Sequence, residues 1–354
     1  MSSSTSSSEL HALVPRPAPA ARPKERAPAV RVVRGDARAR KILAVLAILA
    51  AGLEVVTRLA LVPSSKDLRR FAAYPAEARA LAAAPGIRLA FVGNSLTERG
   101  VDLAILRESL REEASIEAGA GMFVAHGSHL NTWRSITEHE MWKQGISPDL
   151  LILTFYERGL EDHQPLEVGR LAQFFSDRHD WSELFRHDLT TLEQRADLVV
   201  SSAWATFAVR ERIKERAFGL LPGYKAYVDR GNAITLRHRK PGADKESPAT
   251  HDALNRFLAR AKESHTEVLF VAFPSRSPDP TAEVPYDVPA ETTRIIADAG
   301  MRYLDLRRMP ELSPEHYDDD IHLNEAGRRI YTQRFARELA AILGQRSSRL
   351  SRSR

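Results

Sequence analysis

The sequence predicts an α/β fold: a three-layer α/β/α sandwich with a largely parallel five-stranded sheet, preceded by one transmembrane helix. Three observations lead to this prediction. Short apolar runs alternate with helical stretches from residue 86 to residue 344, a pattern typical of parallel strands joined by crossover helices. Several of these runs are apolar almost throughout, as in strands that are buried on both faces. A separate apolar stretch at residues 42–62 precedes them all.

Composition limits the classes of protein that the chain can belong to. Hydrophobic residues make up 43% of its 354 residues, which is enough for a substantial core. The net charge is +5, but the excess of arginine lies in the two ends, so we expect solvated or membrane-proximal tails and no nucleic-acid partner. The absence of cysteine excludes disulfides and thiolate metal sites.

The N-terminal quarter predicts a tail and an anchor. Residues 1–40 are rich in Ser, Pro and Arg and predict a disordered basic segment. The next stretch, 41–62, predicts a transmembrane signal anchor, because a helix over 42–62 just spans a hydrocarbon core of about 30 Å. Glu54 and Arg58 interrupt it, but they stand four residues apart and can pair on one helix face. The alternative is an amphipathic helix packed on a soluble domain.

Basic residues in front of this stretch predict its orientation. Arg and Lys cluster between residues 31 and 41, which favours a cytoplasmic N-terminus and a large domain on the outer side. In a bacterium this means a single-pass protein of the inner membrane, with its domain in the periplasm or otherwise extracytoplasmic. A small-residue cleavage site is not evident, so an uncleaved anchor is favoured over a removed signal peptide.

The first strand ends in a turn that carries a serine. After a helical linker over 63–85, the run from Ile87 to Val92 predicts a buried strand. Gly93 and Asn94 then allow a sharp turn, and Ser95 follows at the start of a helix. Ligands bind at this edge of open α/β sheets, where free N–H groups can stabilise an oxyanion.

A second polar stretch lies near the other end of the chain, in the segment 317–327. Asp319 stands three residues before His322, just ahead of a predicted helix. One short loop can therefore supply a general base and the carboxylate that orients it. Asp318 and Asp320 are rivals for the orienting role, and the three-residue spacing favours Asp319.

Together these two blocks resemble the SGNH, or GDSL-type, hydrolase family. The Gly-Asp-Ser-Leu block of that family stands here as residues 93–96 with Asn94 at its second position, and its Asp-x-x-His block stands as residues 319–322. The resemblance covers about residues 86–344 and implies Ser95 as nucleophile, His322 as base and Asp319 as its partner, with no metal and no cofactor. It also implies an oxyanion hole made by the N–H groups of Ser95 and of a glycine in the second block.

The sequence does not decide two of the donors of that oxyanion hole. A strand predicted at 114–118 is followed by two glycines, of which Gly121 is the preferred donor and Gly119 the reserve. The third family block should carry an asparagine, but residues 156–159 read Tyr-Glu-Arg-Gly. Arg158 stands nearest to the expected place and is the substitute donor, or else an exposed loop arginine. Losing one such donor costs about 3 kcal/mol of transition-state stabilisation in other hydrolases.

The remaining elements follow in alternation. Helices are predicted from Ser95 to 113 and at 127–143, 251–264, 290–299 and 325–343, and strands at 150–156, 267–273 and 301–306. Residues 160–240 are longer than a strand connection and predict a helical insertion, with a helix over 192–218. His126 and His129 lack further converging ligands, so a metal site is not expected. Residues 345–354 predict a frayed basic tail.

Three functions are compatible with these features. The first is a membrane-anchored serine hydrolase that acts on acyl esters of a glycan or lipid. The second is an O-acyltransferase, for example an O-acetyltransferase, that passes the same acyl group to an envelope polysaccharide. The third is a catalytically inactive binding protein that keeps the fold, a reading favoured by the missing asparagine. The sequence gives no indication of the oligomeric state.

Overall fold

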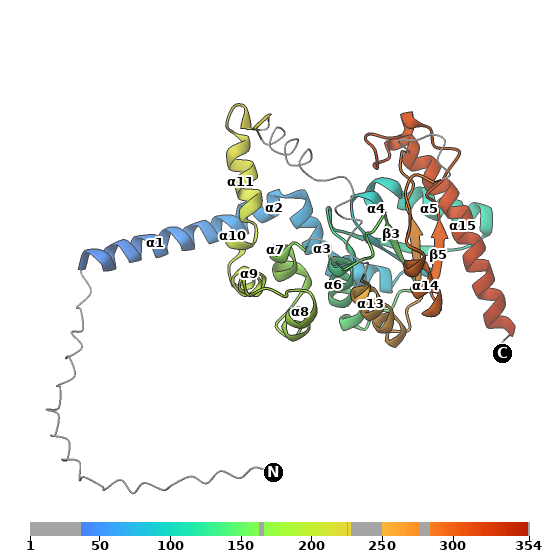
Figure 1. The fold of residues 1–354 in the computed structure, drawn as a ribbon, viewed down its shortest axis with the longest axis horizontal. Coiled ribbons are helices and arrows are strands. Elements are labelled where there is room, and N and C mark those ends of the chain that lie inside the picture. The colour runs from blue at the N-terminus through green and yellow to red at the C-terminus, as the bar shows by residue number, and fades with distance from the viewer. Residues whose placement is uncertain (1–36, 163–165, 225, 228–249, 277–283, 353–354) are drawn as a thin grey trace, which may run out of the picture. The chain divides into compact units, whose positions relative to one another are not determined.

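The computed structural model describes residues 37–162, 166–224, 226–227, 250–276 and 284–352. The chain divides into two compact units, Met1–Leu49 and Ala50–Arg354. The described part of the first unit belongs to helix α1, and the second unit holds the sheet and all other elements (Figure 1). The predicted disordered tail lies outside the described residues up to residue 36, whereas residues 37–40 are already helical.

Five parallel strands form one sheet with the order β2-β1-β3-β4-β5. The strands are β1 (Ile87–Gly93), β2 (Ala118–Val124), β3 (Leu150–Phe155), β4 (Val268–Ala272) and β5 (Arg302–Asp305). The predicted parallel five-stranded sheet is thereby confirmed. Because β1 lies between β2 and β3, the residue that follows β1 emerges at the carboxyl edge between two neighbouring strand ends.

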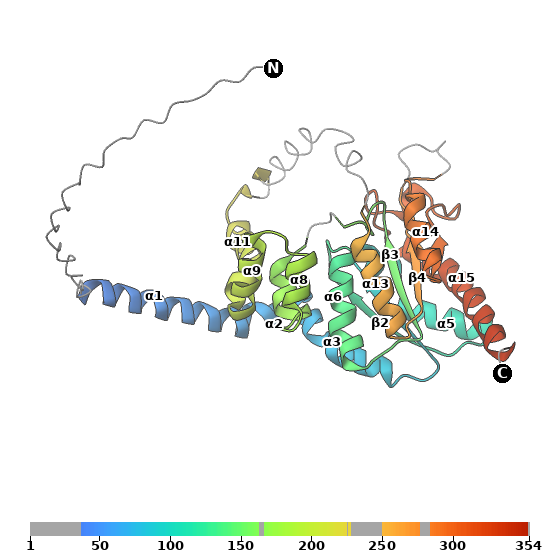
Figure 2. The same ribbon diagram turned by 60° about the horizontal axis from the view of Figure 1, so that its bottom comes forward.

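Helices connect the strands and cover both faces. They are α1 (Ala37–Val56), α2 (Val62–Ser64), α3 (Lys66–Ala82), α4 (Ser95–Gly100), α5 (Leu103–Ala114), α6 (Leu130–Glu140), α7 (Val168–Arg170), α8 (Trp181–His187), α9 (Leu192–Ala203), α10 (Ala205–Ala208), α11 (Arg210–Gly219), α13 (Asp252–Glu263), α14 (Ala290–Asp298) and α15 (Glu325–Arg352). Shorter turns of other helical types are η1 (Thr57–Leu61), η2 (Trp142–Gln144), η3 (Leu171–Phe175) and η4 (Pro314–His316). Helices α3, α6 and α13 pack on one face of the sheet and α5 and α15 on the other, which confirms the three layers (Figure 2).

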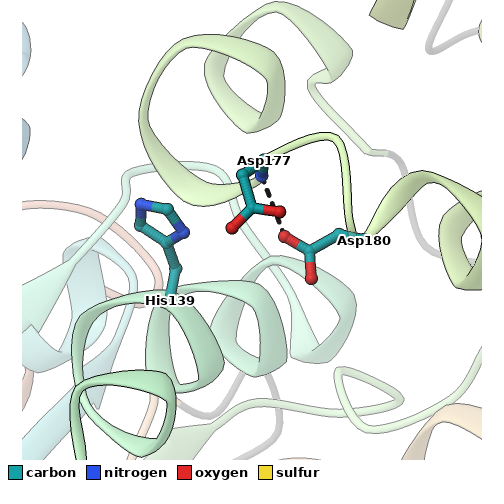
Figure 3. A group of neighbouring side chains, drawn as sticks. All are labelled: His139, Asp177 and Asp180. Atoms are coloured by element: carbon teal, nitrogen blue, oxygen red, sulfur yellow. Dashed lines mark hydrogen bonds between the residues drawn. The ribbon is translucent and has the colours of Figure 1, made fainter.

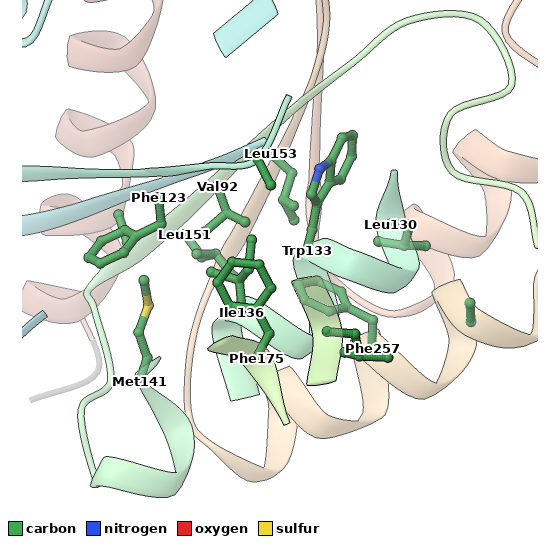
Figure 4. Close-up of a cluster of buried hydrophobic side chains, with 14 of the residues drawn as sticks. Val92, Phe123, Leu130, Trp133, Ile136, Met141, Leu151, Leu153, Phe175 and Phe257 are labelled. Carbon is green, nitrogen blue, oxygen red and sulfur yellow. The ribbon is translucent and has the colours of Figure 1, made fainter. Parts of the chain in front are cut away.

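The alternation of side chains along each strand divides the core into two clusters. Val92, Leu151 and Leu153 point to the face that α6 and α13 cover, together with Trp133 and Phe257 (Figure 4). The intervening strand residues point to the opposite face, against α5 and α15. Since both faces are buried, the strands read as continuous apolar runs in the sequence.

Where the sequence predicts a helical linker over 63–85, helix α3 packs on the sheet within the same compact unit. Its residues Phe71 and Tyr74 are fully buried. The Tyr74 hydroxyl accepts the N–H of Val124 at 2.6 Å and donates to the Val124 carbonyl at 2.5 Å. Because β2 is an edge strand, this hydroxyl satisfies backbone groups that would otherwise lack partners. Because this stretch is rich in alanine, the buried apolar face of α3 is not evident from the sequence.

The region after Ser95 differs from its prediction in two respects. The single helix expected up to residue 113 is divided at Val101 and Asp102, and the Asp102 carboxylate caps α5 by accepting the N–H groups of Ala104 and Ile105. The second strand is Ala118–Val124 rather than 114–118. Glycines usually disfavour strands, but here they lie inside one, and the apolar residues after them complete it.

The insertion after β3 is helical, as predicted, within its described residues. The helix expected over 192–218 is divided into α9, α10 and α11, and residues 228–240 lie outside the described chain. Arg134 of α6 anchors the insertion: it donates to Glu183 and to the buried Asp188, each at 2.6 Å, and Arg256 reaches the same two carboxylates. The insertion is therefore packed on the domain.

Both ends of the described chain are longer helices than predicted. Helix α15 continues through Arg352, where a frayed tail was expected, and residues 353–354 lie outside the description. At the other end, α1, η1 and α2 form a continuous helix, Ala37–Ser64, whose length of 28 residues and composition allow it to cross a membrane. Arg58 donates to Glu54 at 2.7 Å, so the expected i,i+4 pair is present.

Candidate active site

Ser95 is the first residue of α4 and lies two residues beyond the end of β1. A side chain on Gly93 would bring a Cβ to 1.9 Å from the Thr97 hydroxyl, so only glycine lets α4 fold back so closely. Asn94 caps the helix: its Oδ1 accepts the Leu96 N–H at 3.0 Å, and its amide donates to the Ser128 carbonyl at 3.1 Å. The turn thus holds Ser95 at the carboxyl edge and ties it to the loop after β2.

His322 and Ser95 meet at this edge although 227 positions separate them. Nε2 of His322 lies 2.8 Å from Oγ of Ser95. Nδ1 of the same ring lies 2.8 Å from Oδ2 of Asp319. The three predicted residues therefore form one continuous chain of hydrogen bonds from carboxylate to hydroxyl.

The other oxygen of Asp319 fixes this carboxylate to its own loop. Oδ1 accepts the N–H groups of Ile321 at 2.9 Å and of His322 at 2.8 Å. Burial opposes the charged form of Asp319, but these bonds and the imidazole outweigh it and hold the pKa of the carboxyl at about 2. Asp319 is therefore a carboxylate at neutral pH.

Short contacts shape the loop that carries His322. Tyr317 and Leu323 form an antiparallel bridge, and the Asp318 N–H donates to the His322 carbonyl at 2.8 Å. A Cβ on Gly327 would come to 2.3 Å from the His316 carbonyl, so glycine is required where α15 crosses this loop. The Leu-Asn-x-x-Gly continuation of the last block thus has a structural reason: it closes the loop against the helix.

Both rivals of Asp319 are bound to arginines. Asp318 accepts from Arg99 at 2.8 Å and Asp320 from Arg276 at 2.5 Å. Each of these side chains points to a cation and only Asp319 bonds the imidazole, in agreement with the three-residue spacing.

Gly121, the preferred oxyanion donor, is wrongly placed by the sequence prediction. It lies inside β2, opposite Ala90, and Gly119 lies opposite Arg88, whereas the partner of Gly93 is Val124. At about 3.3 Å per residue, Gly121 is roughly 10 Å along the strand from the carboxyl edge. Neither glycine can therefore reach an oxyanion at Ser95.

The turn that does reach the site follows Val124 and was missed. The Ala125 N–H donates to the Gly93 carbonyl at 3.0 Å, which holds residues 125–128 beside the start of α4. The Ser128 hydroxyl accepts from the Trp133 indole at 2.9 Å and so fixes the turn to the core. The apolar run Met122–Ala125 ending at His126 and Gly127 was the signal that could have located this strand end.

Arg158 has a carboxylate partner. Its Nε lies 2.5 Å from Oε2 of Glu161, whose side chain is only 4% exposed. This ion pair stabilises the turn after β3 and holds the Arg158 guanidinium against Glu161. The structure therefore disagrees with the prediction that Arg158 is a substitute oxyanion donor. The sequence offered no local sign of it, because the pairing depends on how deeply the loop buries Glu161.

A cleft of about 520 Å³ lies beside the hydrogen-bonded chain. It begins one turn beyond Ser95, at Glu98 and Arg99, and borders the loop that carries His322 at Asp318, Leu323 and Asn324. Most of the other lining side chains are charged or polar: Lys66, Asp102, His126, Glu325, Arg328 and Arg329. The apolar residues of the lining are Leu323 and Ile105, and the aliphatic stems of Lys66 and the three arginines add further apolar surface. Such a lining offers charged groups of both signs to a polar ligand.

His126 and His139, two histidines outside the loop of His322, have other partners. His126 bonds the Glu98 carboxylate, which also accepts from Arg70 at 2.8 Å. His139 comes close to Asp177 and Asp180, a grouping that could hold a cation (Figure 3). Lys143 donates to Asp177 at 3.0 Å and to Asp180 at 2.5 Å, so its ammonium group already occupies the cationic position.

Comparisons with known proteins give fold-level likeness only. No protein-family model matches the chain, and no curated protein matches it. Among solved structures, it is similar to Axe2, an acetylxylan esterase from Geobacillus stearothermophilus, at 12% identity and a TM-score of 0.37, covering 72% of this chain and 94% of that one. It is also similar to an acetyl xylan esterase, AlAXEase, at 12% identity and a TM-score of 0.35, covering 70% and 98%.

A third similar structure is LAE5, an alpha/beta hydrolase enzyme from the metagenome of Lake Arreo, Spain. The identity is 12% and the TM-score 0.36, with 73% of this chain and 95% of that chain covered. Because these scores are low, the functional assignment rests on the geometry of the site in this chain.

Proposed function

We propose that the chain is a membrane-anchored serine hydrolase of SGNH/GDSL type that acts on acyl esters by a Ser-His-Asp mechanism. The observation that carries this proposal is the unbroken chain of hydrogen bonds from Asp319 through His322 to Ser95, each 2.8 Å long. A nucleophile, a base and a group that orients the base are the parts that acyl transfer requires.

The chemistry follows from these contacts. His322 takes the proton of Ser95 at Nε2 while Oγ bonds to the acyl carbon, and Asp319 stabilises the imidazolium through Nδ1. His322 then gives the proton to the departing alkoxide, which leaves an acyl-serine. Water, deprotonated in turn by His322, attacks this ester and releases the acid and the free serine.

The oxyanion needs donors at the same edge of the sheet. The N–H of Ser95 lies at the start of α4, where a helix leaves its first N–H groups without internal partners. We assign the second donor to the turn at His126 and Gly127, because the Ala125 N–H bond to Gly93 holds that turn against the same strand end. This assignment replaces Gly121.

The cleft favours one class of substrate within the broad assignment. Because its lining is charged and polar, we propose a short acyl group on a polar carrier such as a glycan, rather than a lipid with a long acyl chain. The helix Ala37–Ser64 supports an anchor in the bacterial inner membrane, with the catalytic domain on the periplasmic or extracytoplasmic side.

Ester hydrolysis by the full-length protein tests the assignment. We expect turnover of p-nitrophenyl acetate that falls at least tenfold from the acetate to the decanoate ester, and loss of turnover in Ser95→Ala. A folded protein that hydrolyses no ester and reacts with no fluorophosphonate contradicts the enzyme proposal and favours a binding module. Faster turnover of the decanoate contradicts the polar-carrier proposal alone.

Hydrolase and transferase share the acyl-serine and differ in what attacks it. Supplying an acylated donor together with a polysaccharide acceptor separates them. Release of free acid in proportion to donor consumed supports the hydrolase, whereas acyl groups recovered on the acceptor, dependent on Ser95, indicate an O-acyltransferase.

A further inference from the structure

The helical insertion carries an unusual amount of exposed apolar surface. Among the residues that the structure describes beyond Leu59, every large apolar side chain that is at least 38% exposed lies in the segment 192–227. They are Leu192, Val199, Val200, Trp204, Phe218, Leu220, Leu221 and Tyr227. Leu220 and Tyr227 are 85% and 75% exposed, a state that costs free energy in water for side chains of this size.

This insertion is attached to the last turns of the apolar helix. Glu54 accepts the backbone N–H groups of Ala205 and Thr206, both at 2.9 Å, and the Thr206 hydroxyl at 2.8 Å. Helix α10 has no cap from its own N-cap side chain, so the Glu54 carboxylate satisfies the donors that a helix start leaves free. Thr57, one turn further on, is buried, and its hydroxyl lies 3.0 Å from the Thr206 hydroxyl, to which it can donate.

A second attachment joins α11 to the chain just after that helix. Arg212 donates to Asp67 at 3.1 Å, and Arg216 donates to the Ser64 hydroxyl at 2.9 Å. Figures 1 and 2 show α9, α10 and α11 gathered beside α2, apart from the sheet. The insertion is thus held at both sides of the point where the apolar helix ends.

The length of the apolar helix indicates how deep in the bilayer the contacts of Glu54 and Thr57 with the insertion lie. Lys41 is the last charge before the apolar stretch, and about 20 residues are needed to cross a hydrocarbon core of about 30 Å. A span that begins at Ile42 therefore ends near Leu61 and includes Glu54 and Thr57. Opposite the face that α10 covers, Val56 and Leu59 are 58% and 76% exposed, as lipid-facing side chains would be.

We propose that the described residues of the segment 192–227, which include α9, α10 and α11, form a membrane-seated module, whose exposed apolar side chains contact the outer leaflet of the bilayer beside the span. Tryptophan and tyrosine concentrate at membrane interfaces, and Trp204 and Tyr227 are among these exposed side chains. The four hydrogen bonds to Glu54, one from Arg58 and three from α10, remove the cost of a bare carboxylate within the span. The proposal rests on the membrane anchor of the proposed function.

Lipid-borne quenchers test this surface directly, and the absence of cysteine makes single-site labelling clean. The full-length protein is reconstituted into vesicles with a bimane label on one of four variants: Leu220→Cys, Leu221→Cys, Leu46→Cys within the span, and Glu112→Cys on the exposed face of α5. We expect brominated lipids to quench the labels at 220 and 221 at least threefold more than the label at 112. Both leucines are exposed, so their replacement leaves the packing intact.

The remaining outcomes overturn the proposal in distinguishable ways. In one outcome, lipid quenches the label at 46 while aqueous iodide quenches the labels at 220 and 221 as it does the label at 112. This result supports the membrane anchor and contradicts the membrane-seated module. Protection of 220 and 221 from both quenchers indicates a protein partner or a second copy instead of lipid. Absence of lipid quenching at 46 overturns the module and the anchor together, while fluorophosphonate labelling still reports on the catalytic site.

Discussion

The two edges of the sheet place two acidic side chains in opposite environments. At the carboxyl edge, Asp319 accepts three hydrogen bonds, stays 54% exposed and has a pKa of about 2. At the amino edge, where α6 ends, Glu140 is 3% exposed and burial raises its pKa to about 7. One edge therefore keeps a carboxylate charged and within reach of a reactant, whereas the other holds a carboxyl in the protein interior. Changes at the first should affect activity, and changes at the second stability.

Replacement of the nucleophile should have the largest effect on activity. Ser95→Ala should lower kcat/KM for ester hydrolysis by about 10³-fold or more, because the acyl-enzyme can no longer form. The melting temperature should stay within about 2 °C of the wild type, since the Ser95 side chain is partly exposed and bonds only His322 among the described residues.

A serine at the amino edge provides the matched control. Ser147 donates to the Ser264 carbonyl at 2.9 Å, far along the chain from the catalytic loops. Ser147→Ala should leave kcat/KM unchanged and lower the free energy of unfolding by about 1 kcal/mol. Equal activity losses in both variants would remove the distinction between the two edges.

Within the carboxyl edge, three adjacent aspartates should separate by role. Asp319→Asn should lower kcat by about 10²- to 10⁴-fold, because an amide no longer holds the imidazole in the tautomer that accepts the serine proton. Asp318→Asn and Asp320→Asn should cost less than about fivefold, since each exposed carboxylate only pairs with an arginine. Steady-state rates for the three variants make the comparison, and a large loss in either neighbour contradicts the assignment of Asp319.

Arg158 tests whether the loop after β3 takes part in catalysis. Arg158→Ala should lower the free energy of unfolding by about 3 kcal/mol, because it leaves the buried Glu161 without this cation. At temperatures where the variant is folded, kcat should change by less than about fivefold. A fall of about 10²-fold in kcat with unchanged stability would instead identify Arg158 as an oxyanion donor.

Glu140 gives a pH-dependent effect on stability alone. Because its pKa is raised in the folded state, the folded protein keeps a proton that the unfolded chain loses, so stability falls as the pH rises from about 4 to about 7. Glu140→Gln removes this loss and should raise the free energy of unfolding by about 3 kcal/mol at pH 8, with little change at pH 4. Urea unfolding at the two pH values measures it, and a pH-independent difference contradicts the account.

The hydrogen-bonded arrangement of Ser95, His322 and Asp319 could be predicted from the sequence because local contacts position each of the two segments that carry them. Asn94 caps the helix that starts at Ser95, and Asp319 binds N–H groups two and three residues further on. These contacts are encoded in short stretches, so the turn and the loop appear in the residue pattern. The parallel sheet follows in the same way from its apolar runs.

The remaining parts depend on contacts between distant residues. The position of Gly121 is set by the register of β2 against β1, and two glycines in a row of small residues were taken for a strand end. The partner of Arg158 depends on the depth of its loop. The role of α3 depends on the Tyr74 hydroxyl reaching Val124, 50 positions away. None of these has a local signature, because each is decided only when the layers pack.

The identity of the reactive serine tests the central claim most directly. The folded full-length protein is treated with a fluorophosphonate, digested, and the modified peptide is located by mass spectrometry. The account predicts a single adduct on Ser95, lost in Ser95→Ala and slowed at least a hundredfold in His322→Ala. An adduct on another serine, or equal labelling of Ser95 with and without the imidazole of His322, contradicts it.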